Sequence, residues 1–170
     1  MAVEESVRDG KKNLTGSAAA VATPHRQRVV RKKATKNLLP ELHSRCLLCG
    51  DKNPLSLGLR FEPSGEDVVQ TELLLHRRLQ GYDGILHGGV ISSLLDAAMT
   101  HCLFHAGIAA VTGDLHVRFL HPVPCEEKVA IRSWVLSAFP PLYSVRAELL
   151  VEGRVMAWGV GKFAQRRKNS

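Results

Sequence analysis

A histidine followed by two glycines, His87-Gly88-Gly89, precedes an apolar stretch that contains a single acidic residue, Asp96. The first turn of a helix leaves backbone N–H groups unpaired, and the peptide dipoles add about half a positive charge there. Glycines at 88 and 89 allow a substrate carbonyl to approach these donors, which predicts an oxyanion site for acyl transfer. The alternative is that paired glycines simply ease a tight turn from loop to helix.

Asp96 lies within a helical pattern of apolar residues. An unpaired carboxylate is costly in such surroundings, so this aspartate is a candidate general base or nucleophile. The structural alternative is that an N–H, hydroxyl or arginine on a neighbouring strand satisfies its charge.

The spacing of these two features has a mechanical consequence. Nine residues of helix place Asp96 about 13 Å along the axis from His87 and roughly half a turn round it. One helix cannot bring both groups to the same carbonyl. If both act, each site combines His87-Gly88-Gly89 of one subunit with Asp96 of its partner, which predicts an obligatory dimer with two equivalent sites.

The surrounding elements follow from the hydrophobic periodicity. Apolar residues spaced three to four apart predict one long helix that begins near Val90 and stops at Gly107, and Glu152-Gly153 predicts a hairpin turn. Alternation and turn signals predict strands at residues 57–61, 68–75, 110–120, 128–138, 142–151 and 154–165. This order predicts an α+β fold, with an antiparallel sheet of about six strands around one central helix.

The stretch Gly-Ile-Leu-His-Gly-Gly-Val-Ile-Ser-Ser-Leu-Leu-Asp-Ala-Ala-Met, residues 84–99, resembles the signature of hot-dog-fold thioesterases of the phenylacetate-pathway (PaaI-like) type. The resemblance extends upstream to Cys46-x-x-Cys49-Gly50 and to residues 53–61, and downstream to residues 112–124. It covers residues 46 to about 165 and implies the hot-dog fold. It also implies hydrolysis of an acyl-CoA thioester to a free acid and CoA, with no metal and no organic cofactor.

The resemblance assigns a role to each site residue. Asp96 falls on the catalytic carboxylate, His87 on the histidine that holds water or the thioester carbonyl, and Gly88 or Gly89 on the amide that polarises that carbonyl. Thr112 falls on a hydroxyl near the attacking water, and Thr100, one helical turn beyond Asp96, competes for that role. Water activation and direct attack by the carboxylate both stay open. The competing function is a non-catalytic acyl-CoA-binding module, either a sensor or a regulator.

Other side chains are assigned more general roles. Arg118 and His121 are candidates to pair with CoA phosphates, and Tyr82 is a candidate for the acyl pocket. Cys46 and Cys49, with His43 nearby, are one ligand short of a four-ligand zinc site, so no metal is predicted there.

The net charge of +7 is concentrated at one end of the chain. Residues 1–45 hold ten Lys/Arg against four Asp/Glu, and the other 125 residues hold thirteen against twelve. We interpret residues 1–42 as a disordered basic tail or leader, 43–166 as the hot-dog domain and 167–170 as a basic C-terminal tail. Nucleic-acid binding is not predicted, because no aromatic residue is interleaved with the basic ones. Without an apolar span or a signal peptide, the expectation is a cytoplasmic protein that does not bind membranes. The shared site and the resemblance imply a homodimer or a dimer of dimers.

Overall fold

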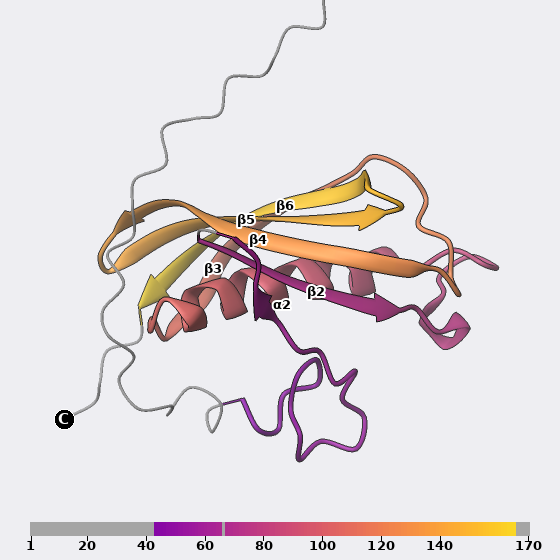
Figure 1. Cartoon of the computed structure of the whole chain (residues 1–170), viewed down its shortest axis with the longest axis horizontal. Helices are drawn as coiled ribbons and strands as arrows, with labels where there is room; N and C mark the ends of the chain where they lie inside the picture. Colours follow the sequence, from indigo (N-terminus) through magenta and orange to yellow (C-terminus); the bar gives the residue numbers. More distant parts are fainter. Residues whose placement is uncertain (1–42, 66, 166–170) are drawn as a thin grey trace, which may run out of the picture.

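The computed structural model describes residues 43–65 and 67–165, and in it one long helix lies against the concave face of a curved sheet (Figure 1). The helix is α2 (Gly88–His105), and a short 3-10 turn, η1 (Arg77–Leu79), precedes it. The strands are β1 (Glu62–Pro63), β2 (Val68–Leu74), β3 (Ala110–Phe119), β4 (Lys128–Phe139), β5 (Leu142–Val151) and β6 (Arg154–Gln165). The predicted α+β architecture of six antiparallel strands around one helix is confirmed.

The boundaries of α2 follow from its terminal residues. His87 caps the N-terminus with extended backbone angles, and at the other end Gly107 adopts a φ of 76°, which only glycine adopts without cost. The predicted stop at Gly107 is therefore confirmed. Nine of the eighteen helical residues are buried, and they point to several sides of the helix: Ile91, Leu94, Leu95, Ala97, Ala98, Met99, Thr100, Cys102 and Leu103. A helix that is apolar on several sides must be covered on more than one of them.

The sheet covers one side of α2. Its strands run in the order β1-β2-β4-β5-β6-β3, so β3 follows the helix and returns to the far edge. The turn between β5 and β6 has positive φ at both Glu152 (48°) and Gly153 (79°), which matches the right-handed twist of the two strands it joins. This confirms the predicted hairpin.

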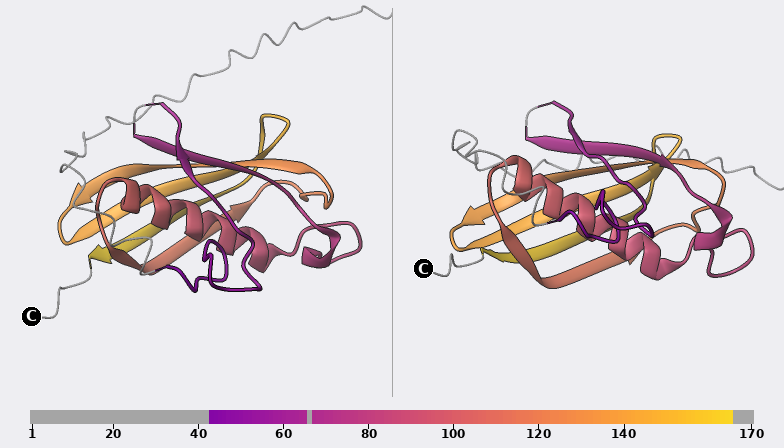
Figure 2. Two further views of the ribbon diagram at one scale, coloured as in Figure 1. Left: turned by 60° about the horizontal axis from the view of Figure 1, so that its bottom comes forward. Right: turned by 90° about the horizontal axis from the view of Figure 1, so that it is seen from below.

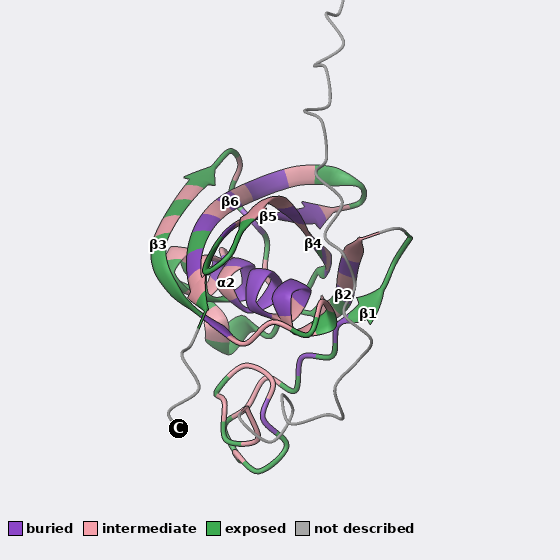
Figure 3. Cartoon of the chain, turned by 90° about the vertical axis from the view of Figure 1, so that its left-hand side faces the viewer, coloured by how far each residue is buried: buried purple, intermediate pink, exposed green. Residues whose placement is uncertain are grey.

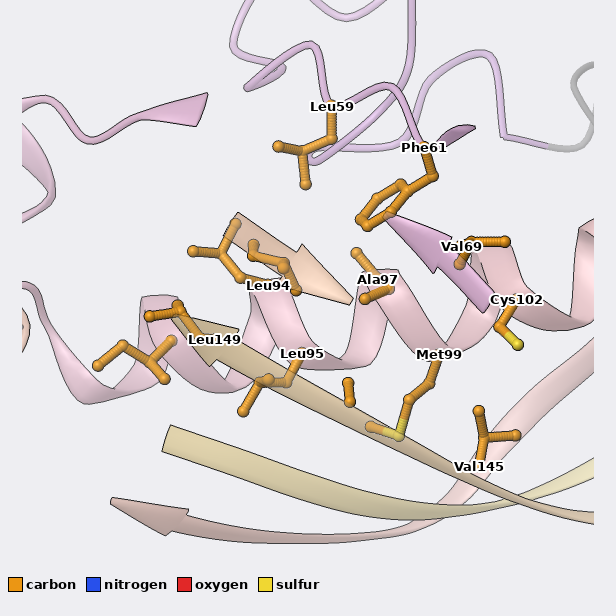
Figure 4. Close-up of a cluster of buried hydrophobic side chains, with 14 of the residues drawn as sticks. Leu59, Phe61, Val69, Leu94, Leu95, Ala97, Met99, Cys102, Val145 and Leu149 are labelled. Carbon is orange, nitrogen blue, oxygen red and sulfur yellow. The ribbon is translucent and has the colours of Figure 1, made fainter. Parts of the chain in front are cut away.

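Residues 43–61 cover the opposite side of α2, as the view along the helix shows (Figure 3). Leu59 and Phe61, both buried, pack onto the helix from this segment, whereas Val145 and Leu149 of β5 lie on its other side (Figure 4). The core therefore has two layers with α2 between them. The same segment crosses α2 in both turned views (Figure 2).

The strand predicted at residues 57–61 is wrong. Regular pairing starts only at Glu62, and Gly58 has a φ of 65° that breaks the extended run. The N–H groups of Leu57 and Leu59 instead donate to the carbonyls of Leu47 and Leu48, at 3.0 and 2.9 Å. The apolar alternation is real, but it buries Leu59 against the helix through a loop and not through the sheet.

The predicted tails, residues 1–42 and 167–170, lie outside the described residues. Within residues 43–65 and 67–165, no helix is long and apolar enough to cross a lipid bilayer.

The central position of α2 makes its core leucines the most sensitive to truncation. Leu95 is fully buried, so Leu95→Ala should lower the free energy of unfolding by about 2–5 kcal/mol through lost burial and the cavity that is left. Urea denaturation measures this change. Leu55→Ala is the matched control, because Leu55 is 76% exposed and its loss should cost less than about 0.5 kcal/mol. Equal effects of the two substitutions would contradict the two-layer core.

Candidate functional site

A compact loop positions the start of α2. Gln80 and Leu86 form an antiparallel bridge, and Arg77 pairs with Asp83 across the loop at 2.6 Å. The His87 N–H donates to the Leu79 carbonyl at 2.9 Å. The loop thus closes directly before the helix, and it delivers His87 to the N-cap position.

The His87 imidazole caps the helix itself. Its Nδ1 accepts a hydrogen bond from the Gly89 N–H at 2.9 Å, so in the neutral ring the proton is on Nε2, which can donate to a ligand. A Cβ at Gly89 would lie 3.0 Å from Nδ1, and one at Gly81 would lie 3.1 Å from Cδ2, so both glycines leave room for the ring. Because the cap occupies the Gly89 amide, Gly88 is the better candidate for the oxyanion donor.

Asp96 is half-buried on α2, and its carboxylate is satisfied from the edge strand. The Thr112 hydroxyl on β3 donates to Asp96 Oδ1 at 2.7 Å. Thr100 is buried in the core, at 8% exposure. The structure therefore separates the two threonines that the sequence left as alternatives, and it places Thr112 beside the carboxylate.

A bulge in β3 accompanies this contact. The pairing of β3 with β6 shifts between Thr112, opposite Phe163, and Asp114, opposite Lys162, which leaves Gly113 as the extra residue. Bulges bend a strand and redirect the side chains beside them, and they are frequent next to active sites. Nothing in the sequence pattern indicated this irregularity.

His87 and Asp96 do not meet within one chain. His87 is the N-cap of the helix that carries Asp96, so about nine residues of continuous helix, roughly 13 Å along the axis, separate the two. One chain thus presents two half-sites: a helix N-terminus with an imidazole donor, and a carboxylate oriented by a hydroxyl.

Of the residues predicted to contact substrate, two are exposed and one, His121, is half-buried. Tyr82 is 81% exposed in the loop before α2, and Arg118 is exposed near the end of β3. His121, just beyond β3, lies 2.8 Å from an Arg154 guanidinium nitrogen through its Nε2. Arg154 is a cationic neighbour that the sequence analysis missed, because it comes from the distant start of β6.

Two of the four cysteines, Cys49 and Cys102, are poor nucleophiles. Burial raises the pKa of Cys102 to about 12, and burial together with a hydrogen bond to Cys46 raises that of Cys49 to about 12. Their thiolate fractions are therefore small at neutral pH. Burial also lowers the pKa of His101, to about 4, so its imidazole is neutral.

With this geometry established, the comparisons with known proteins identify the class. Residues 83–157, which include the α2 N-terminus, Asp96 and Thr112, match the sequence model of the thioesterase superfamily. This part of the chain, 75 of the 170 residues, is similar to that superfamily, and the described domain has the hot-dog fold.

Among individual proteins, the chain is similar to acyl-coenzyme A thioesterase THEM4 of Bos taurus, with 40% identity over 55 residues, 32% of this chain and 22% of that protein. Its fold matches the E. coli PaaI protein from the phenylacetic acid degradation operon, with a TM-score of 0.61, 20% identity, and coverage of 65% and 81%. It also matches smu.793 from Streptococcus mutans bound to acetyl-CoA, with a TM-score of 0.60, 16% identity, and coverage of 66% and 91%. The chain thus spans about a fifth of the length of THEM4, and the two structures establish the fold alone.

The Thr112–Asp96 hydrogen bond should contribute measurably to stability. Thr112→Val keeps the shape of the side chain but removes the donor to a half-buried carboxylate, and the expected cost is about 1–2 kcal/mol in the free energy of unfolding. Thr112→Ser keeps the hydroxyl and should retain most of this stability. If the valine and serine variants unfold at the same urea concentration, the hydrogen bond contributes nothing to the fold.

Proposed function

We propose that this protein is an acyl-CoA thioesterase, which hydrolyses an acyl-CoA thioester to the free carboxylic acid and CoA. The observation that carries the proposal is the Asp96 carboxylate, held by Thr112 at 2.7 Å on a helix whose N-terminus presents backbone N–H groups. The match of residues 83–157 to the thioesterase superfamily and the acetyl-CoA bound to smu.793 support it.

Each half-site has a task in this reaction. Asp96 takes a proton from a water molecule, and the resulting hydroxide attacks the thioester carbonyl carbon. The Gly88 N–H, the helix dipole and the His87 Nε2–H stabilise the negative charge that develops on the carbonyl oxygen. The C–S bond then breaks, the acid is released, and the CoA sulfur takes up the proton. In the alternative route, Asp96 attacks the carbonyl directly, the C–S bond breaks and CoA leaves as the thiolate, which takes up a proton. Water then cleaves the resulting anhydride, which releases the acid and restores the Asp96 carboxylate.

The active form is proposed to be a homodimer in which each site combines His87 and Gly88 of one subunit with Asp96 of the other. If both half-sites act on one carbonyl, their separation along α2 calls for a second chain. Strand β3 lies at the sheet edge, and it exposes Val111 and Phe119, each 51% exposed. An exposed apolar edge strand is suited to pair with a second copy of itself. Pairing of two such dimers would give a tetramer.

CoA recognition is proposed to use cationic groups near the end of β3. Arg118 and the His121–Arg154 pair are exposed or half-buried there, and guanidinium groups bind phosphate oxygens through several N–H donors. Tyr82, exposed on the loop before α2, is a candidate to contact the acyl group.

Asp96→Asn tests the chemistry. It keeps the shape of the side chain but removes the proton acceptor, so hydrolysis should fall at least about a hundredfold, roughly 2.7 kcal/mol of barrier. Thiol release from phenylacetyl-, benzoyl-, short-, medium- and long-chain acyl-CoA measures this and also indicates the acyl group. Asp51→Asn, at an exposed residue outside the site, is the control. If neither protein releases thiol but both bind acyl-CoA, the chain is a binding module and not an enzyme.

A mixing experiment tests the shared site. His87→Ala and Asp96→Asn chains should each be nearly inactive, but a heterodimer of the two contains one site with both residues intact. After unfolding and refolding as an equal mixture, half the dimers are mixed, so activity should recover to about a quarter of the wild-type value per chain. Each variant refolded alone is the control. An equal mixture that stays as inactive as its components would show that the two residues do not act across a dimer.

A further inference from the structure

Three potential metal ligands meet in the segment that covers α2, and none of them is a residue of the candidate active site. The ligating atoms of His43, Cys46 and Cys49 all lie within 4.8 Å of one another. Cys49 Sγ and His43 Nδ1 are 3.6 Å apart. We propose that these three side chains bind a zinc ion that stabilises residues 43–61 on the helix.

The spacing agrees with zinc coordination. Zinc binds sulfur at about 2.3 Å and imidazole nitrogen at about 2.0–2.1 Å, which in a tetrahedron sets sulfur and nitrogen about 3.6 Å apart. The Cys49–His43 distance has this value. A simple thiol–imidazole hydrogen bond would account for two of the groups, but it would not explain why Cys46 joins them.

The backbone is folded around the first cysteine. The Leu48 N–H donates to Cys46 Sγ at 3.4 Å, and the Gly50 N–H donates to the Cys46 carbonyl at 2.9 Å. A Cβ at position 50 would lie 2.6 Å from the Ser44 carbonyl oxygen, so only glycine fits. The loop is therefore tightly built, and the N–H donor at the sulfur would stabilise a metal-bound thiolate.

A second observation comes from the helix beneath this loop. The Nε2 atom of His101 is buried and has no hydrogen-bond partner among the described residues. Its ring lies 6.4 Å from the His43 ring, and it stacks on Phe61. A water molecule in the fourth coordination position of the zinc would provide a hydrogen-bond partner for His101 Nε2. If the His101 ring rotated, the ion itself could be that partner.

The proposed ion has a structural task. The ligands lie in a segment with little regular structure, which packs on α2 through the His43–Phe104 ring contact at 4.7 Å and through buried Leu59 and Phe61. A metal that joins three side chains within seven residues would hold this loop in its packed form. Structural zinc contributes its binding free energy to folding in this way.

The test is the metal content of the full chain, purified without a histidine tag from zinc-supplemented cells. Mass spectrometry of the metals should find about one zinc per chain. Cys46→Ser and Cys49→Ser should reduce it to background, and Cys125→Ser, at a half-buried cysteine outside the cluster, should leave it unchanged. When cobalt(II) replaces zinc, the protein should show the absorption of tetrahedral thiolate coordination. A chelator should lower the unfolding temperature of the wild type but not that of the Cys46→Ser and Cys49→Ser variants.

Other results would overturn the proposal. Wild-type protein that contains no zinc and binds none when titrated has no site, and a Cys46–Cys49 disulfide in protein as isolated indicates a redox pair instead. If the serine variants fail to fold by circular dichroism, the wild-type zinc titration and cobalt spectrum decide. None of these measurements depends on thioester hydrolysis, so an inactive protein that binds zinc would refute only the proposed enzyme.

Discussion

The burial of α2 on several sides is the constraint on which the rest of the structure depends. A helix with buried residues on more than one side cannot rest on the sheet alone, because the side away from the sheet would stay in water. Residues 43–61 supply the second cover through Leu59 and Phe61. This cover gives a segment with little regular structure a role in the core, and a metal that stabilises the loop would strengthen it.

The only carboxylate of α2, Asp96, is placed where this apolar helix meets the edge of the sheet. There the carboxylate is half-buried and finds a hydroxyl donor, so its charge is tolerated without an ion pair. The bulge at Gly113 lies beside that donor. The helix N-terminus with its histidine cap lies about two and a half turns away, so the fold itself separates the proposed proton acceptor from the proposed donors to the oxyanion. A second subunit is the simplest way to reunite them.

The proposed metal cluster and the proposed active site share the helix but not their chemistry. The cluster holds soft sulfur and imidazole ligands in a covering loop, whereas the site holds an exposed helix terminus and a carboxylate. Burial lowers the pKa of His43, and the negative charge of Asp96 opposes this effect in part.

The sequence by itself determined the helix with its stop at Gly107, the strands from residue 68 onward and the Glu152-Gly153 turn, because periodicity and backbone preferences are local properties. It also supplied the candidate residues His87, Gly88 and Asp96. Tertiary structure alone decided three matters. Residues 57–61 pair with residues 47 and 48 instead of joining the sheet, Thr112 and not Thr100 contacts Asp96, and the Gly89 amide is used by the His87 cap. Each of these depends on which groups the folded chain brings within hydrogen-bonding distance, and a hydrogen bond between distant residues or a bulge leaves no periodic trace in the sequence.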